Sequence, residues 1–193
     1  MRRKTFDVLF EPGAGMAALV KQPCLWRSAF YFTLSVGFFT GVVTNSWLIE
    51  QSLQIRFAII ICTVLIAATA LSLYGFLIHG IMETFGALAG DPLGLICLLG
   101  YTTLPFLLLT PGALLAAKMG LGGLPLLGCI FLAGCLWMLY LLVRTLEAVY
   151  LVDGFRAAIT LLFSLLLLYI VFVLPWQIGF KLVSLNFFDS GSL

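Results

Sequence analysis

Two side chains that can exchange protons, His79 and Glu83, lie four residues apart at the border of a long apolar stretch. That spacing places both on one face of an α-helix, where they could form a proton relay or contribute to a metal site. A metal site needs further ligands, and the H-E-x-x-H pattern that supplies them from a helix is absent. We therefore expect a polar helix end facing the cytoplasm, with no metal and no cofactor.

Charged residues near four predicted helix ends form a second candidate group. The connections that carry them fall on one side of the predicted membrane domain, so the group could close one end of a helix bundle through ion pairs, or dock a partner. Of these two roles, the ion-pair cluster is favoured. Its members are Glu83, Asp91, Arg144, Glu147, Asp153 and Arg156.

Catalytic motifs are missing from the sequence. No Ser–His or Cys–His pair has a supporting motif, and no Walker A, G-x-S-x-G or dinucleotide fingerprint occurs. The sequence therefore predicts no catalytic residue and a non-enzymatic protein.

A third candidate group, Gly100, Tyr101 and Pro105, lies in the middle of an apolar stretch that also contains Pro111. Each proline removes a backbone donor and clashes with the preceding helical turn, so this helix is predicted to be kinked or broken. A glycine beside a kink could line a cavity, with the Tyr101 hydroxyl as its polar group. The same residues could instead fill the space inside a bent helix, and packing is the favoured interpretation.

These candidates border five stretches that carry no charged residue: 28–49, 57–78, 93–117, 124–143 and 157–180. A membrane-spanning helix needs about 20 apolar residues. The sequence therefore predicts an all-α polytopic membrane protein with a bundle of five transmembrane helices. Residues that carry charge inside a membrane mark ion paths, and these stretches have none.

The composition supports a membrane protein over a soluble one. Hydrophobic residues make up 63% of the 193 positions and charged residues 9%, whereas soluble domains have about 25% charged residues. The net charge of +2 is too small to suggest a nucleic-acid partner. The lipid bilayer is the expected partner, with a second membrane protein or a second copy of the chain as further possibilities.

Three segments are expected along the chain. Residues 1–27 form a cytoplasmic, interfacial segment that Pro12 and Gly13 divide into two short helical pieces, although a partly ordered tail is an equal alternative. Residues 28–180 form the transmembrane domain, in which the second span continues past residue 78 and Asp91 caps the third. Residues 181–193 form a short tail.

The basic residues predict the orientation. Seven of them fall on the side of the N-terminus and three on the opposite side, so the positive-inside rule places the N-terminus in the cytoplasm and the C-terminus outside. No apolar core follows the N-terminal basic cluster, so no cleaved signal peptide is expected. The seven are Arg2, Arg3, Lys4, Lys21, Arg27, Arg144 and Arg156, and the three are Arg56, Lys118 and Lys181.

The order of these features resembles the Yip family of Ypt/Rab-interacting membrane proteins over roughly residues 5–175. The resemblance rests on His79 with the following glycines, on the stretch 99–105 and on the stretches 147–150 and 154–157. It implies a five-span domain, and its compact form suggests the prokaryotic branch and a bacterial cytoplasmic membrane. Eukaryotic members contact Rab-class GTPases, and their cytoplasmic arm carries an acidic-Leu-Tyr-Gly-Pro element. This chain has Leu9-Phe10-Glu11-Pro12-Gly13 instead, so a Rab-type partner is not expected.

Two functions follow as hypotheses. The first is a non-enzymatic membrane protein that organises the membrane, as in trafficking, or scaffolds a partner complex. The second is a small transporter or channel subunit, because broken helices hold substrates in transporters. The absence of a charge within the spans argues against ion coupling.

Overall fold

The computed structural model describes residues 3–47, 51–87, 90–173 and 177, and this part of the chain is helical without a strand. The helices follow one another as α1 (Arg3–Phe10), α2 (Pro12–Val20), α3 (Leu25–Trp47), α4 (Leu53–Thr84), α5 (Pro92–Leu99), the 3₁₀ turn η1 (Gly100–Thr103), α6 (Leu104–Lys118), the 3₁₀ turn η2 (Gly120–Gly123), α7 (Leu124–Tyr150), α8 (Gly154–Leu168) and the π-helical turn η3 (Tyr169–Val173).

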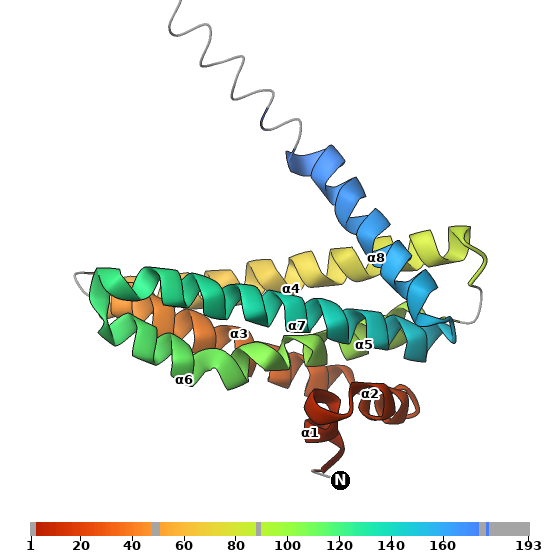
Figure 1. The fold of residues 1–193 in the computed structure, drawn as a ribbon, viewed down its shortest axis with the longest axis horizontal. Coiled ribbons are helices and arrows are strands. Elements are labelled where there is room, and N and C mark those ends of the chain that lie inside the picture. Colours follow the sequence, from red (N-terminus) through yellow and green to blue (C-terminus); the bar gives the residue numbers. More distant parts are fainter. Residues whose placement is uncertain (1–2, 48–50, 88–89, 174–176, 178–193) are drawn as a thin grey trace, which may run out of the picture.

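Helices α3, α4, α6 and α7 run side by side along the long axis of the molecule, and α5 continues the line of α6 (Figure 1). Helix α8 starts against α4 and α7 and then diverges from the bundle, while α1 and α2 lie across its side. The chain is therefore a bundle with one splayed helix and one appended helical pair.

Four helical segments in the described residues are long and apolar enough to cross a membrane: Leu53–Thr84, Pro92–Lys118, Gly120–Tyr150 and Gly154–Val171. The structure therefore shows four of the five predicted spans by length and composition, within the residues it describes. The first predicted span forms α3, whose 23 residues suffice in length. Its Ser, Thr and Asn side chains lower its hydropathy, and predicted residues 48 and 49 lie outside the described part. The second predicted span does continue past residue 78, to Thr84.

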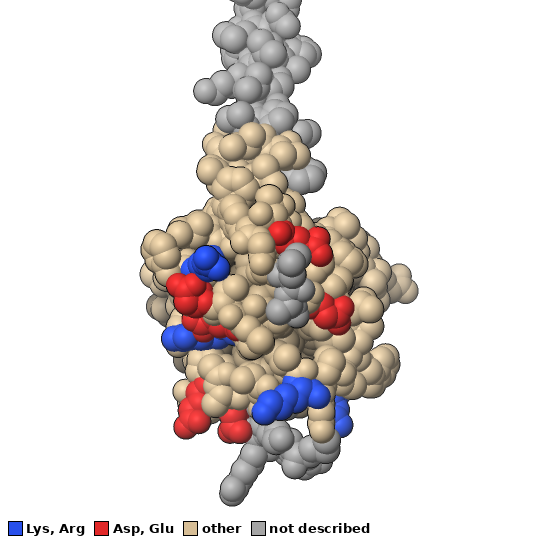
Figure 2. Space-filling view, turned by 90° about the vertical axis from the view of Figure 1, so that its right-hand side faces the viewer, with Lys and Arg blue, Asp and Glu red and all other residues tan. Residues whose placement is uncertain are grey.

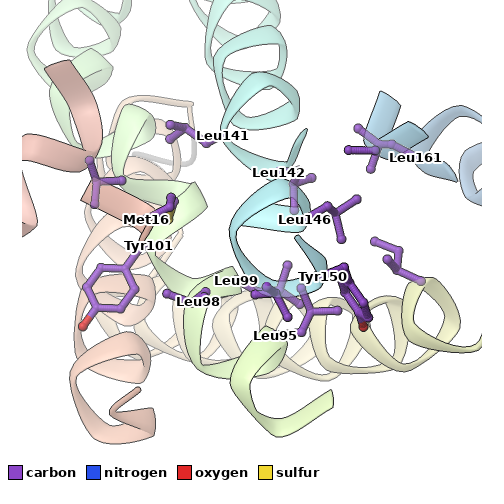
Figure 3. Packing of buried hydrophobic residues seen from close by; sticks show 14 of the residues in the cluster. Met16, Leu95, Leu98, Leu99, Tyr101, Leu141, Leu142, Leu146, Tyr150 and Leu161 are labelled. Carbon is purple, nitrogen blue, oxygen red and sulfur yellow. The ribbon is translucent and has the colours of Figure 1, made fainter. Parts of the chain in front are cut away.

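The surface of the bundle is apolar, as a bilayer requires. Large side chains such as Ile66, Leu115 and Leu162 are exposed, whereas Leu141 and Leu146 on α7 are fully buried. Such a broad apolar surface would be unfavourable in water but is matched to lipid chains. The core cluster is richest where α5, α7 and the C-terminal part of α4 meet (Figure 3).

The third predicted span is broken, as predicted, and the break lies at η1 before Pro105. Pro105 has no N–H to give the Tyr101 carbonyl, which instead accepts a bond from the Leu104 N–H in a tighter 3₁₀ turn. Thr103 Oγ1 donates to the Gly100 carbonyl over 2.8 Å. Pro111 lies inside the continuous helix α6 and causes no second break.

Residues 3–20 form two short helices that meet at Pro12, which occupies the first turn of α2, where a missing N–H costs nothing. Val8 and Met16 are fully buried between the pair and the bundle, and α2 packs against α7 and α5. Gly15 permits this pairing, because a Cβ there would lie 2.7 Å from the Val8 nitrogen. The two helical pieces of the prediction are thus present. Their position relative to a membrane surface stays a prediction.

Candidate functional site

One end of the bundle gathers most of the candidate charged residues. The C-termini of α4 and α7 and the N-termini of α5 and α8 lie together there, and we name this region the charged end. Figure 2 shows acidic and basic side chains gathered on this end of the molecule. Glu83, Asp91, Arg144, Glu147, Asp153 and Arg156 lie on these four helix ends or on the residues that cap them.

His79 connects α4 to α7 at the charged end. Its Nδ1 lies 2.6 Å from the Tyr150 hydroxyl, and its Nε2 lies 3.3 Å from Glu83 Oε1. Tyr150 extends from α7 toward α4 and is only 2% exposed (Figure 3). His79 and Glu83 therefore share one helix face, as their spacing predicted, and they form with Tyr150 a row of polar contacts that we call the relay Glu83–His79–Tyr150.

Gly90 covers this relay. A Cβ at Gly90 would overlap the ring of Tyr150, so the backbone before α5 lies in direct contact with this ring. Asp91 then caps α5, with its two carboxylate oxygens accepting from Leu93 N–H at 3.3 Å and Gly94 N–H at 2.9 Å. The predicted capping role of Asp91 is confirmed. Its carboxylate is committed to the backbone and takes no part in the relay.

Arg144 and Glu147 form the pair that their spacing allowed, with 2.7 Å between Nη1 and Oε2. The guanidinium also lies 5.2 Å from the centre of the Tyr140 ring, and its Nε donates to the Tyr140 hydroxyl at 3.3 Å. The Glu147 carboxylate lies against Gly154 at the start of α8. This pair therefore lies between the end of α7 and the start of α8.

Asp153 and Arg156 form a looser pair, with 3.9 Å between Oδ1 and Nε and both side chains largely exposed. Asp153 precedes α8 as expected, but its side chain makes no capping hydrogen bond. A pocket opens beside this pair, between the end of α4 and the first turns of α8.

Gly100, Tyr101 and Pro105 belong to a different part of the structure. All three are buried, and Gly100 N–H donates to Ser28 Oγ on α3 over 3.1 Å. The Tyr101 ring packs 5.5 Å from the ring of Tyr31 on α3. The pocket at the charged end includes none of these three residues. Their contacts agree with the packing interpretation of this segment.

A family model, the Yip1 domain, matches residues 6–174 of this sequence. The chain belongs to the Yip1 domain family. We found no match to it among curated proteins, and none among solved structures. The predicted resemblance is therefore confirmed, and it assigns the chain to a family of membrane proteins.

Within this Yip1-domain chain, the described residues contain no cluster of three or more His, Cys, Asp or Glu side chains that could hold a metal ion. The polar groups of Glu83, His79 and Tyr150 bond mainly to one another among the described residues. Each of the three ion pairs lies within one helix or joins a helix to its capping residue, and the His79–Tyr150 contact is the polar link that the described residues show between two of these helix ends.

Sequence reasoning missed two tyrosines of this Yip1 domain. Tyr150 follows Glu147 by three residues and Tyr140 precedes Arg144 by four, so both could have been placed on the faces of the charged side chains. What the sequence could not supply was the partner of Tyr150, because His79 lies 71 positions away in the chain. Thr160, which lines the pocket, carried no sequence signal at all.

Proposed function

We propose that this Yip1-domain protein is a non-enzymatic organiser of the membrane, a scaffold that acts through its surface within the bilayer. The observation that carries the proposal is the divergence of α8 from the bundle (Figure 1). On α8, Leu162 is 67% exposed and Leu166 is 54% exposed. A splayed apolar helix presents a surface that only lipid or another membrane helix can cover.

The charged end supports a scaffold role by holding this shape. The relay fastens α4 to α7, and the Arg144–Glu147 pair lies against the start of α8. A rigid end with a divergent helix gives the molecule unequal cross-sections along its axis. Such a shape favours one membrane curvature over another.

The orientation and the span number belong to this proposal. We propose that α3 is a fifth span, because it lies beside α4 and α6 along the bundle axis (Figure 1). With the N-terminus in the cytoplasm of a bacterial cell, the charged end then faces inward and the C-terminus lies outside. The α1–α2 pair lies at the inner surface. No Rab-type GTPase is part of the proposal.

The test is reconstitution of the purified chain into unilamellar vesicles of defined lipid. We expect vesicle diameter, measured by electron cryomicroscopy, to fall or tubules to form as the protein-to-lipid ratio rises. Replacing Leu162 and Leu166 with alanine should weaken this effect. The matched control replaces Leu132 and Leu136, which are equally exposed on α7, and should leave it intact. Unchanged vesicles with a protein that remains monomeric by crosslinking would contradict the proposal.

A small transporter or channel subunit is the second candidate, favoured by the break at η1. Broken helices hold substrates in several transporter folds. Against this role, the residues of η1 are buried, and η1 packs against α3. A liposome flux assay with a broad solute panel decides between them, with Pro105→Ala and Pro111→Ala compared with the native chain. Flux that the variants alter would replace the scaffold proposal.

A further inference from the structure

A pocket of about 380 Å³ lies at the charged end, beside the splayed helix. Its walls are the last turn of α4, the segment that follows it and the first two turns of α8. Apolar side chains make up most of the lining, with Met82, Phe85 and Phe155 among them. Because α4 and α8 are both candidate spans, the pocket lies at the level where helices leave the hydrocarbon.

Thr160 gives the pocket an unused polar group. Its side chain is 1% exposed, and its Oγ1 has no hydrogen-bond partner. Several other hydroxyls on these helices bond to a backbone carbonyl in the preceding turn, as Ser164 Oγ does to the Leu161 carbonyl at 2.8 Å. A buried hydroxyl without a partner is unfavourable. A ligand with an acceptor oxygen would relieve this cost.

The pocket also carries one charge of each sign. Arg156 and Asp153 both line it, and their separation of 3.9 Å leaves each able to bond elsewhere. The N–H groups of the first turn of α8 have no acceptor within the helix, and the Asp153 side chain does not cap them. The pocket therefore offers a positive side for a phosphate and a negative side for a cation.

We propose that this pocket binds a phospholipid with a phosphoethanolamine headgroup. The phosphate lies against Arg156 and the start of α8, and the primary ammonium donates hydrogen bonds to the Asp153 carboxylate. An ester carbonyl of the glycerol accepts from the Thr160 hydroxyl after this side chain rotates toward the pocket, and the nearby acyl carbons lie on Phe85 and Phe155. An ethanolamine ammonium can donate to Asp153, whereas a choline headgroup has no N–H to give.

Charge decides against an anionic lipid. The phosphate of phosphatidylglycerol could also lie against Arg156, but this headgroup brings no cation to the Asp153 carboxylate, which would stay unpaired beside a negative charge. A zwitterionic headgroup can lie antiparallel to the Asp153–Arg156 pair, so that both charges gain a partner. This assignment rests on the pocket and not on the scaffold role.

The test is native mass spectrometry of the full chain in detergent, with equal amounts of phosphatidylethanolamine, phosphatidylcholine and phosphatidylglycerol. We expect one phosphatidylethanolamine to be retained about tenfold more strongly than either other lipid, the scale of one charge-assisted hydrogen bond. Asp153→Asn and Arg156→Gln should each remove most of this preference. Thr160→Val should weaken retention, and Thr160→Ser should restore it.

Arg144→Gln is the matched control, because it removes a cation from the charged end without touching the pocket lining. It should leave the lipid preference unchanged. Circular dichroism and gel filtration verify that each variant is folded.

Equal retention of the three lipids, or a preference for phosphatidylglycerol, would overturn the assignment. So would binding of soluble phosphoethanolamine as strong as that of the lipid, since the acyl contacts would then contribute nothing. If vesicle shape is unaffected by the protein but lipid selectivity is seen, the scaffold proposal fails and this one stands.

Discussion

The contact between the C-terminal ends of α4 and α7 depends most directly on Tyr150. Its hydroxyl is bonded to His79, and its ring is covered by Gly90. Tyr150→Phe keeps the ring and leaves His79 Nδ1 without its partner. We expect the free energy of unfolding to fall by about 1–2 kcal/mol, the cost of a lost bond at a largely buried group.

Unfolding in mixed micelles, followed by circular dichroism, measures this change. Tyr140→Phe is the control, because it also removes one hydroxyl at the charged end, but from a residue that is 46% exposed and keeps its ring beside Arg144. Its effect should be smaller than that of Tyr150→Phe. Equal effects would show that the relay contributes no more than a surface contact.

At the scale of single residues, the sequence anticipated contacts within one helix. The His79–Glu83 and Arg144–Glu147 pairs follow from spacings of four and three residues, which the helix itself brings together. Contacts between helices were not anticipated, because nothing in the spacing of His79 indicates Tyr150. The pocket was not anticipated either. Its lining comes from the end of α4 and the start of α8, which come together only in the folded protein.

The broken third span shows how an element depends on its neighbours. Gly100 lies so close to α3 that a Cβ would come within 2.8 Å of the Ser28 carbonyl carbon. Gly100→Ala must push α3 away from η1, and we expect a loss of about 1–3 kcal/mol in the free energy of unfolding. Denaturant titration in detergent measures it.

Gly128→Ala on α7 supplies the comparison, because a Cβ there meets nothing within 4 Å. Alanine is favoured over glycine within a helix by about 0.5–1 kcal/mol, so this variant should be as stable as the native chain or more stable. If both substitutions change stability in the same direction, the close approach of η1 to α3 is not what requires glycine at position 100.

The helix pair α1–α2 is attached to the bundle by few buried side chains, with Met16 prominent among them. Met16→Ala should open this pair locally, since truncating a buried methionine costs about 2–5 kcal/mol. Hydrogen exchange over residues 3–20 should become faster while exchange in α7 is unchanged. Phe10→Ala, at a side chain that is 77% exposed, should alter neither. Uniform acceleration throughout the chain would instead make α1–α2 part of the cooperative fold.

Element boundaries followed from local chemistry to a large extent. Pro12 and Asp91 begin helices where the sequence indicated, and the second span extends to Thr84 as its helical phase suggested. The position of the break in the third span did not follow from its prolines alone. Pro111 remains inside α6, and the 3₁₀ turn forms at η1, where Pro105 and two threonines act together.

For the whole molecule, the decisive question is whether α3 crosses the membrane. If it does, Lys21 and Ser52 lie on opposite sides; if it does not, they lie on the same side. We predict that a cysteine at position 52 is labelled by an impermeant maleimide on intact cells, and that one at position 21 is labelled only after permeabilisation. Both substitutions are made after the native cysteines are replaced by alanine. Labelling of both positions from one side would leave the protein with the four spans that hydropathy indicates.

The sequence by itself determined that this protein is helical, that it lies in a membrane and that its charges border the spans. These properties depend on composition and on periodicity along one helix, which no tertiary contact is needed to establish. Tertiary structure decided which borders meet. It brought Tyr150 to His79 and Asp153 and Arg156 to a pocket beside Thr160, and it separated α8 from the bundle. Those outcomes depend on packing between distant segments, for which an almost uniformly apolar sequence carries little distinguishing pattern.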